Sequence, residues 1–155
     1  MLPDKPTTLA QALTALAESR PTDHTRGFRF RSLTGEELNY PWFAMEREAR
    51  RRGALLLASG IRKGDRLAVV IAEPHEFVLT FLGAVAAGIV PVPIYPRAGF
   101  KAKNAYVETV SHIVAAAGAR VLITLENTRE VIEEVVAKGA ALERILTVEE
   151  FFRGE

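Results

Sequence analysis

One run of apolar residues, Leu67-Ala68-Val69-Val70-Ile71, constrains the fold of this chain more than any other feature of its sequence. Consecutive apolar residues leave neither face of a strand for solvent, so the strand that they form must be covered on both sides. Such strands are typical of parallel sheets, in which helices pack on both faces and connect each strand to the next. The run therefore predicts an α/β fold with a mostly parallel sheet.

Strand and helix patterns alternate along the rest of the chain, as a parallel sheet requires. The predicted strands are 66–72, 89–94, 120–124 and 144–147, and the predicted helices between them are 74–87, 104–117 and 126–138. Asn104 is expected to cap the second of these helices. Pro91 and Pro93 lack the N–H group that a sheet ladder needs, so their strand is predicted to lie at an edge or to be bulged.

The residues before the sheet predict a helix, a hairpin and a second helix. Segments 8–20 and 41–59 carry apolar residues at steps of three and four, which is typical of helices. Segments 27–33 and 37–40 alternate around a turn at Thr34-Gly35-Glu36, which predicts a β-hairpin. The apolar stripe of the second helix consists of Trp42, Met45, Ala49, Gly53 and Leu56. We expect residues 1–155 to form a single α/β unit.

Charge and cysteine content exclude several classes of function. Lys plus Arg is 20 and Asp plus Glu is 19, so the net charge of +1 gives no field that attracts nucleic acid. Four arginines, at positions 47 and 50 to 52, alternate with glutamates and are expected to form a solvated helix face, with a phosphate or nucleic-acid patch as the alternative. The absence of cysteine excludes a disulfide framework, a thiolate zinc site and a cysteine nucleophile.

Targeting and membrane signals are missing from the sequence. Residues 1–8 lack the apolar segment of a signal peptide. The most apolar stretch, 78–94, is interrupted by glycines and prolines, whereas a membrane span needs about 20 continuous apolar residues. We expect no membrane span and a cytoplasmic location.

The sequence holds no recognisable catalytic motif. It contains neither of the two glycine-rich phosphate-loop patterns, Gly-x-Gly-x-x-Gly and Gly-x-x-x-x-Gly-Lys-Ser/Thr, and it contains no Gly-x-Ser-x-Gly pattern. No catalytic residue is therefore assigned. The three histidines, His24, His75 and His112, are too far apart in sequence to suggest a metal site. His24 is expected in a loop and His112 on the solvent side of a helix.

Ligands of open α/β sheets bind beyond the carboxyl ends of the strands. The candidate substrate-binding residues at those ends are His75, Tyr95 and Arg97. For His75, a histidine that merely begins a helix at the surface is the competing interpretation. For Arg97, which lies near Lys101 and Lys103, the competing interpretation is a solvated basic loop.

Several segments, in order, resemble the adenylate-forming acyl ligases. The segment Gly64-Asp65-Arg66-Leu67 is similar to that family's Gly-Asp-Arg-Val strand. The helix ending in Ala87-Gly88, followed by Val90-Pro91-Val92-Pro93, resembles its early core motif. Residues 113–124 continue the similarity, and Leu38-Asn39-Tyr40 resembles the family's Leu-Thr-Tyr segment. Tyr95-Pro96-Arg97 most resembles the fatty acyl-AMP ligases and long-chain acyl-CoA synthetases.

The resemblance implies that residues 1–155 are an N-terminal subdomain of a larger, truncated AMP-binding ligase domain. Such a ligase joins a fatty acid to ATP, with Mg²⁺, and passes the acyl group from the acyl-adenylate to a thiol of coenzyme A or a carrier protein. The phosphate loop, the ribose-binding aspartate and the mobile lysine of the family do not occur in this sequence. The chain alone is therefore expected to be inactive and to hold no cofactor.

A different function remains open at this stage. The chain can instead be a freestanding, non-catalytic binding module that kept the fold and lost the reaction. Under the ligase interpretation, apolar surface that another subdomain would cover is exposed, and exposed patches of a few hundred Å² tend to find partners. We therefore also expect self-association into a symmetric dimer.

Overall fold

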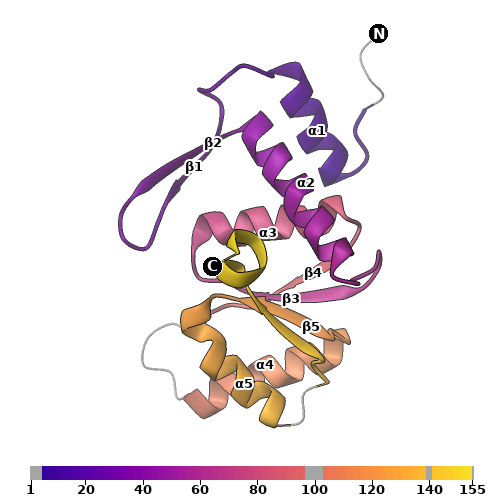
Figure 1. The fold of residues 1–155 in the computed structure, drawn as a ribbon, viewed down its shortest axis with the longest axis vertical. Coiled ribbons are helices and arrows are strands. Elements are labelled where there is room, and N and C mark those ends of the chain that lie inside the picture. Colours follow the sequence, from indigo (N-terminus) through magenta and orange to yellow (C-terminus); the bar gives the residue numbers. More distant parts are fainter. Residues whose placement is uncertain (1–4, 97–102, 139–140, 155) are drawn as a thin grey trace.

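The computed structural model describes residues 5–96, 103–138 and 141–154, which form two groups of helices around a central sheet (Figure 1). The first elements are α1 (Leu9–Ser19), β1 (Gly27–Arg31), β2 (Glu37–Pro41) and α2 (Trp42–Ala58). The sheet and its connections follow as β3 (Arg66–Val70), α3 (Pro74–Ala86), β4 (Val90–Pro93), α4 (Lys103–Ala117), β5 (Val121–Thr124), α5 (Arg129–Ala137) and β6 (Arg144–Thr147). Two short helices, η1 (Glu126–Thr128) and η2 (Glu149–Arg153), complete the fold.

The four sheet strands are parallel and lie in the order β4-β3-β5-β6, which confirms the predicted fold class. The apolar run that defines β3 lies at the centre, and Leu67, Ala68 and Val69 are completely buried. The strand with Pro91 and Pro93 lies at an edge, as expected for residues that cannot donate to a second neighbour. Strand boundaries 144–147 agree with the prediction.

Helices cover both faces of the sheet. Ala84 of α3 and Leu56 of α2 pack with Phe152 of η2 against one face. Val110 of α4 and Ile132 of α5 pack against the other. The arrangement explains why the strand residues of β3 and β5 are apolar on both sides.

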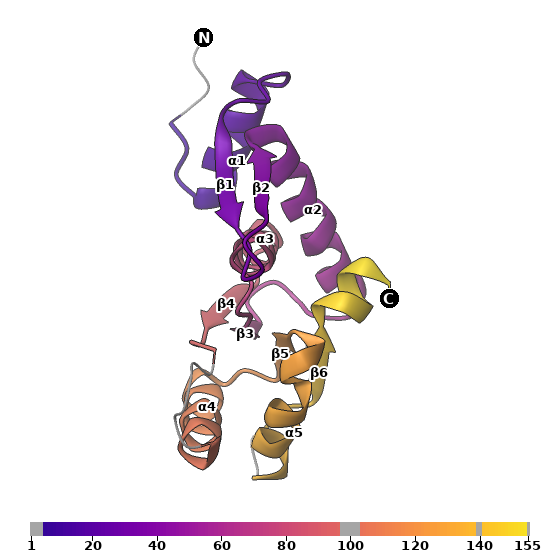
Figure 2. The same ribbon diagram turned by 90° about the vertical axis from the view of Figure 1, so that its left-hand side faces the viewer.

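The N-terminal elements form a third layer on the outer side of α3. Figure 2 shows α3 lying between the sheet and the hairpin that β1 and β2 form. Leu13, Phe30, Met45 and Leu79 join α1, the hairpin, α2 and α3 in one apolar cluster. The predicted hairpin and the apolar stripe of the second helix are thus confirmed.

Besides shifts of one or two residues at the ends of strands, two predictions about helices differ from the structure. Helix α4 already includes Lys103, so Asn104 lies inside the helix and is not its N-cap. The helix expected over 126–138 is divided into two elements, η1 and α5. In η1, which is a 3₁₀-helix, backbone hydrogen bonds join residues three apart, whereas in the α-helix α5 they join residues four apart.

Candidate functional site

An apolar hollow lies at the carboxyl ends of β3 and β4, where ligands of open α/β sheets bind. It has a volume of about 480 Å³ and is lined by Ile71, Ala72, Pro74, Phe77, Pro93, Ile94, Tyr95 and Pro96. Strands β3 and β4 both end at this hollow, and the first turn of α3 forms a third wall. The arrangement can bind an apolar group but offers few hydrogen-bonding partners.

Tyr95, one of the candidates from the sequence, lies at the mouth of this hollow. It is 80% exposed, and its backbone carbonyl accepts a hydrogen bond of 3.2 Å from the Tyr106 hydroxyl of α4. Arg97, the neighbouring candidate, lies outside the described residues. The structure therefore places one of the two at the hollow and makes no statement about the other.

His75 does not line the hollow, although it begins the same helix. Its Nε2 lies 3.3 Å from a carboxylate oxygen of Glu76, and its Nδ1 lies 3.7 Å from one of Glu73. The imidazole stacks against the Tyr40 ring of the hairpin, with ring centroids 6.4 Å apart. It is thus half-buried beneath the hairpin, and not a histidine at the open surface. His24 and His112 are exposed, as expected.

A buried ionic cluster next to His75 was missed by the sequence interpretation. Arg52 is only 4% exposed and Glu76 only 3%, and their side chains form an ion pair of 2.6 Å. Arg153 of η2 reaches the other oxygen of Glu76, also at 2.6 Å. The Arg52 guanidinium also lies 4.6 Å from the centre of the Phe152 ring and donates to Thr80 Oγ1 at 3.0 Å. The cluster joins α2, α3 and η2.

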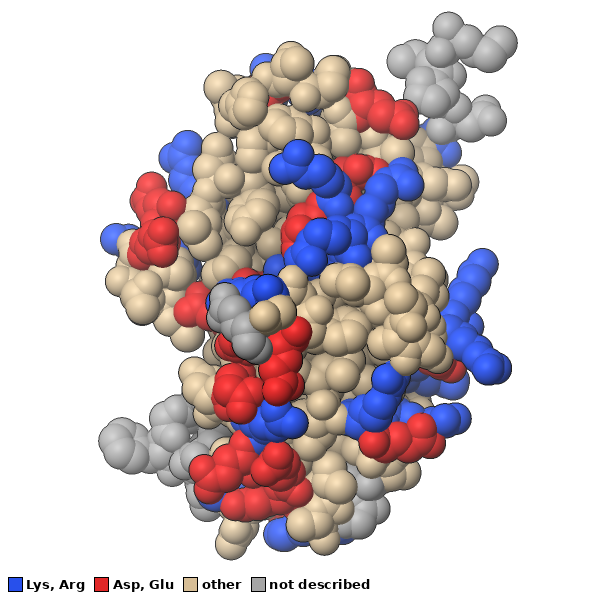
Figure 3. All heavy atoms as spheres, viewed as in Figure 1, with Lys and Arg blue, Asp and Glu red and all other residues tan. Residues whose placement is uncertain are grey.

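The expectation that all four arginines of α2 are solvated is therefore wrong at Arg52. Arg47, Arg50 and Arg51 are exposed, and Figure 3 shows basic side chains gathered over α2. Position 52, however, falls on the apolar stripe between Ala49 and Leu56, which faces α3. Helical periodicity alone, given more weight than the charge pattern, would have indicated its burial.

The buried cluster sets the protonation of its acidic members. Burial alone would raise the pKa of Glu76, but the Arg52 and Arg153 guanidinium groups outweigh it and hold that pKa below the ordinary value of 4.5. Burial raises the pKa of the Tyr40 hydroxyl, and the neighbouring Glu76 carboxylate raises it further. Glu76 is therefore an anion at neutral pH whose charge is neutralised by arginines, which is a structural role.

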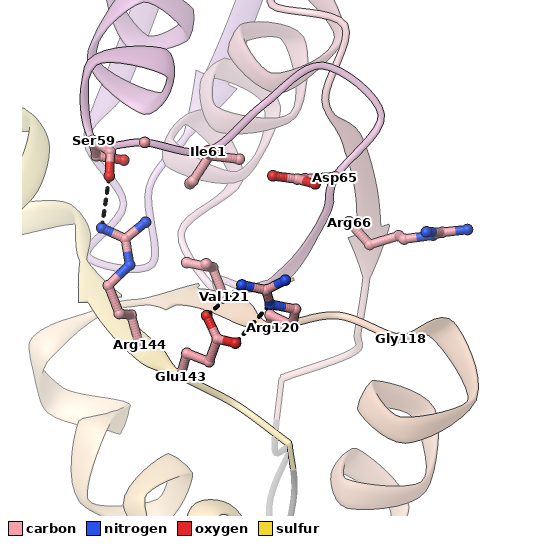
Figure 4. A pocket seen from close by; sticks show the side chains of 10 residues that line it. Ser59, Ile61, Asp65, Arg66, Gly118, Arg120, Val121, Glu143 and Arg144 are labelled. Atoms are coloured by element: carbon pink, nitrogen blue, oxygen red, sulfur yellow. Dashed lines mark hydrogen bonds and ion pairs between the residues drawn. The ribbon is translucent and has the colours of Figure 1, made fainter.

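A polar hollow of about 360 Å³ lies at the opposite, amino edge of the sheet (Figure 4). There Arg120 forms a two-pronged pair with Glu143, at 2.7 and 2.8 Å. Arg144 donates to the Ser59 carbonyl at the end of α2, at 2.9 Å. Arg120 is thus paired with a carboxylate, and Arg144 is paired with a carbonyl at a helix C-terminus, where a cation is favoured.

Within residues 5–96, 103–138 and 141–154, no three His, Asp or Glu side chains are placed to hold a metal ion. In the same ranges no helix is long and apolar enough to cross a membrane.

Comparison with known proteins supplies what the geometry alone does not. Residues 17–153 match the family model described as AMP-binding enzyme, which is most of the chain. The chain belongs to this AMP-binding enzyme family. The resemblance to adenylate-forming ligases seen in the sequence is thereby confirmed.

Named relatives of this AMP-binding chain are acyl ligases. The fatty acid–[acyl-carrier-protein] ligase ScoC of Streptomyces coeruleorubidus is 30% identical over 145 residues, which is 94% of this chain and 25% of that ligase. The long-chain-fatty-acid–CoA ligase FadD13 of Mycobacterium tuberculosis is 34% identical over 91 residues, 59% of this chain and 17% of the ligase. The AMP-binding chain thus spans a quarter or less of the length of these relatives.

The fold of the AMP-binding chain matches solved structures of the family. A fatty acyl-adenylate ligase, from a study of the E. coli and L. pneumophila enzymes, superposes with a TM-score of 0.80 at 22% identity. The match covers 99% of this chain and 26% of the ligase chain. The layered α/β architecture is therefore that of the acyl-adenylating ligases.

Proposed function

We propose that this chain forms the N-terminal part of a ligase that activates a fatty acid with ATP to an acyl-adenylate and transfers the acyl group to a thiol. The observation that carries the proposal is the apolar hollow at the carboxyl edge of the sheet, in a chain of the AMP-binding family. A hydrocarbon tail suits a cavity whose lining consists of aliphatic and aromatic side chains. The named relatives support a fatty acid as substrate, and either coenzyme A or a carrier protein as acceptor.

The residues present do not suffice for the chemistry of that ligase. ATP and Mg²⁺ need phosphate-binding backbone and carboxylate ligands, and neither glycine-rich loop occurs in the sequence. The buried Arg52 is already paired with Glu76 and Glu48, so it does not offer a phosphate site. In this proposal the chain contributes acyl-binding surface, and the nucleotide is held by other parts of the ligase.

Binding of a fatty acid is the direct test. Isothermal titration calorimetry of the chain with octanoate is expected to show binding at one site. Replacing Ala72 by phenylalanine fills the hollow between β3 and α3, and should weaken octanoate binding by at least ~10-fold, since each displaced methylene contact is worth ~0.8 kcal/mol.

The matched control places the same side chain elsewhere. Ala54→Phe adds it on the exposed side of α2, away from the hollow, and should leave octanoate affinity unchanged. Equal loss of affinity in both variants, or no octanoate binding by the unmodified chain, would contradict the proposed acyl site.

Catalysis by the isolated chain is expected to be absent. With ATP, Mg²⁺ and a fatty acid, pyrophosphate release should not rise above that of the reagents alone, because the sequence lacks the phosphate loop. An enzyme-coupled pyrophosphate assay measures this. Fatty-acid-dependent release would show that the chain holds a complete active site. The symmetric dimer expected from the sequence stays a prediction, and sedimentation equilibrium would detect it.

A further inference from the structure

Helix α2 carries a stripe of exposed arginines. Arg47, Arg50 and Arg51 lie at steps of three and four, so they occupy one outward face of the helix. Arg47 has no hydrogen bond or ion pair with any residue of the described ranges. Arg50 and Arg51 pair with Glu46 and Glu48, whose side chains are only 17% and 22% exposed, whereas those of the two arginines are 65% and 46% exposed. A partner that approaches α2 therefore meets mainly guanidinium groups.

An acidic group lies on the same side of the molecule, on η1, α5 and η2. Arg129 pairs there with Glu126, Glu133 and Glu150, each of which is more than half exposed. Glu149 lies beside them and accepts a hydrogen bond of 3.1 Å from the Glu126 backbone N–H. One guanidinium thus faces four carboxylates, so the acidic group keeps a net negative charge.

The short helix η2 lies between the two charged groups and contacts both. Arg51 donates to the Phe152 carbonyl at 3.0 Å, and Glu150 pairs with Arg129 at 3.2 Å. Figures 1 and 2 both show η2 between α2 and α5. Figure 3 shows basic side chains over α2 and acidic side chains over α5 on one face of the molecule. This face therefore carries opposite charges on opposite sides of η2.

We propose that a second copy of this chain docks on this face, with α2 of each copy against the acidic group of the other. A two-fold axis that lies in the plane of the face, crosses η2 and is perpendicular to the line joining the groups exchanges their positions. Each contact between the copies then occurs twice. The inference is independent of the proposed function, and it differs from the dimer through apolar surface that the sequence predicts.

The order of the charges selects this occupant. A uniformly acidic partner, such as a nucleic acid, would be attracted by α2 and repelled by the acidic group. A partner fits only if it presents both signs in the reverse order, which a second copy does by symmetry. Exposed ion pairs contribute little each, so the association is weak and depends on ionic strength.

Salt and charge reversal test the proposed interface by sedimentation equilibrium. The association constant is expected to fall ~10-fold or more between ~20 mM and ~300 mM NaCl, because salt screens exposed charges. At the lower salt concentration, Arg47→Glu and Glu133→Arg should each weaken association ~10-fold or more, since each places like charges opposite one another at two symmetry-related positions.

A mixture of the two variants provides the decisive measurement. In a dimer of one Arg47→Glu chain and one Glu133→Arg chain, opposite charges face each other again at both positions. The equimolar mixture should therefore associate within ~3-fold of the unmodified chain. Arg29→Glu, at an exposed position of β1 outside this face, makes the same change in net charge and should alter the association constant no more than ~3-fold.

Each outcome decides the inference. Association in the mixture that exceeds that of either variant alone supports it. A dimer that persists at high salt and in both charge-reversed variants would show that the copies meet through apolar surface, and overturns it. A chain that stays monomeric under all these conditions, or a mixture no more associated than its components, also overturns it. None of these results depends on octanoate binding, so the proposed function is tested separately.

Discussion

Replacing Glu76 by alanine is expected to destabilise the folded chain by about 3–5 kcal/mol, the cost of removing one partner from a buried ion pair. Glu76 neutralises Arg52, which is 4% exposed and cannot turn its guanidinium into solvent. The substitution also removes the contact between Arg153 and Glu76 and so loosens η2 from α3. Glu48 remains near Arg52, at 2.8 Å, and keeps the loss from being larger. Urea unfolding followed by Trp42 fluorescence measures the change.

The control for this prediction is Glu46 of α2, a glutamate whose arginine partner lies in solvent. Glu46 pairs with Arg50, whose side chain is largely exposed, so Glu46→Ala should cost less than about 1 kcal/mol. If Glu76→Ala and Glu46→Ala were equally mild, the Arg52–Glu76 pair would not be buried as the structure places it.

Acid should remove the difference between the unmodified chain and Glu76→Ala. The folded-state pKa of Glu76 is held below its ordinary value, so its ionisation stabilises the fold above that ordinary value, near 4.5. This stability is lost as the pH falls through the lower, folded-state pKa. The free-energy difference between the two proteins should therefore be full at pH 7 and shrink below about pH 4. A difference that stays constant down to pH 3 would contradict the assignment.

The sheet was predictable because its signal is local. Residues 67–71 are apolar at every position over a segment of strand length, which favours a strand buried on both faces over a longer buried helix. The edge position of β4 followed equally directly from Pro91 and Pro93, since a missing N–H group is a property of the residue itself. Neither inference needed to know which helix packs where.

The candidate site was only partly predictable, because it depends on contacts between distant segments. Tyr95 and His75 both follow strand ends, yet they do not lie at the same site. Tyr95 lies at the mouth of the hollow, whereas His75 lies outside it. His75 turns towards the hairpin ring of Tyr40, a contact of residues far apart in sequence. Arg52 was misjudged for a related reason. Helical periodicity indicates that position 52 is buried, but the partner that makes a buried arginine tolerable is a glutamate of the next helix, of which the neighbouring residues give no sign.

Replacing Gly53 by valine is expected to cost about 3 kcal/mol, near the upper end for overpacking in a well-packed interior. Helices α2 and α3 cross here with their backbones in close contact. A Cβ atom at Gly53 would lie 2.7 Å from the Gly83 carbonyl oxygen, and one at Gly83 would lie 2.8 Å from Cβ of Arg52. Because the nearest atom is backbone, no side-chain rotation relieves the collision, and the helices must move apart.

Such a movement would reach the ionic cluster, since Arg52 lies next to Gly53 and its partner Glu76 is on α3. The effects of the two substitutions on the free energy of unfolding should therefore not be additive. Glu76→Ala should lower that free energy by less in the Gly53→Val background than in the unmodified chain. Ala54→Val, one residue further along α2 at an exposed position, isolates the helix propensity of valine and should cost less than about 1 kcal/mol. Urea unfolding of the unmodified chain, the three single variants and the double variant measures these differences. Equal effects of valine at 53 and 54 would mean that the two helices do not cross as closely as the glycines allow.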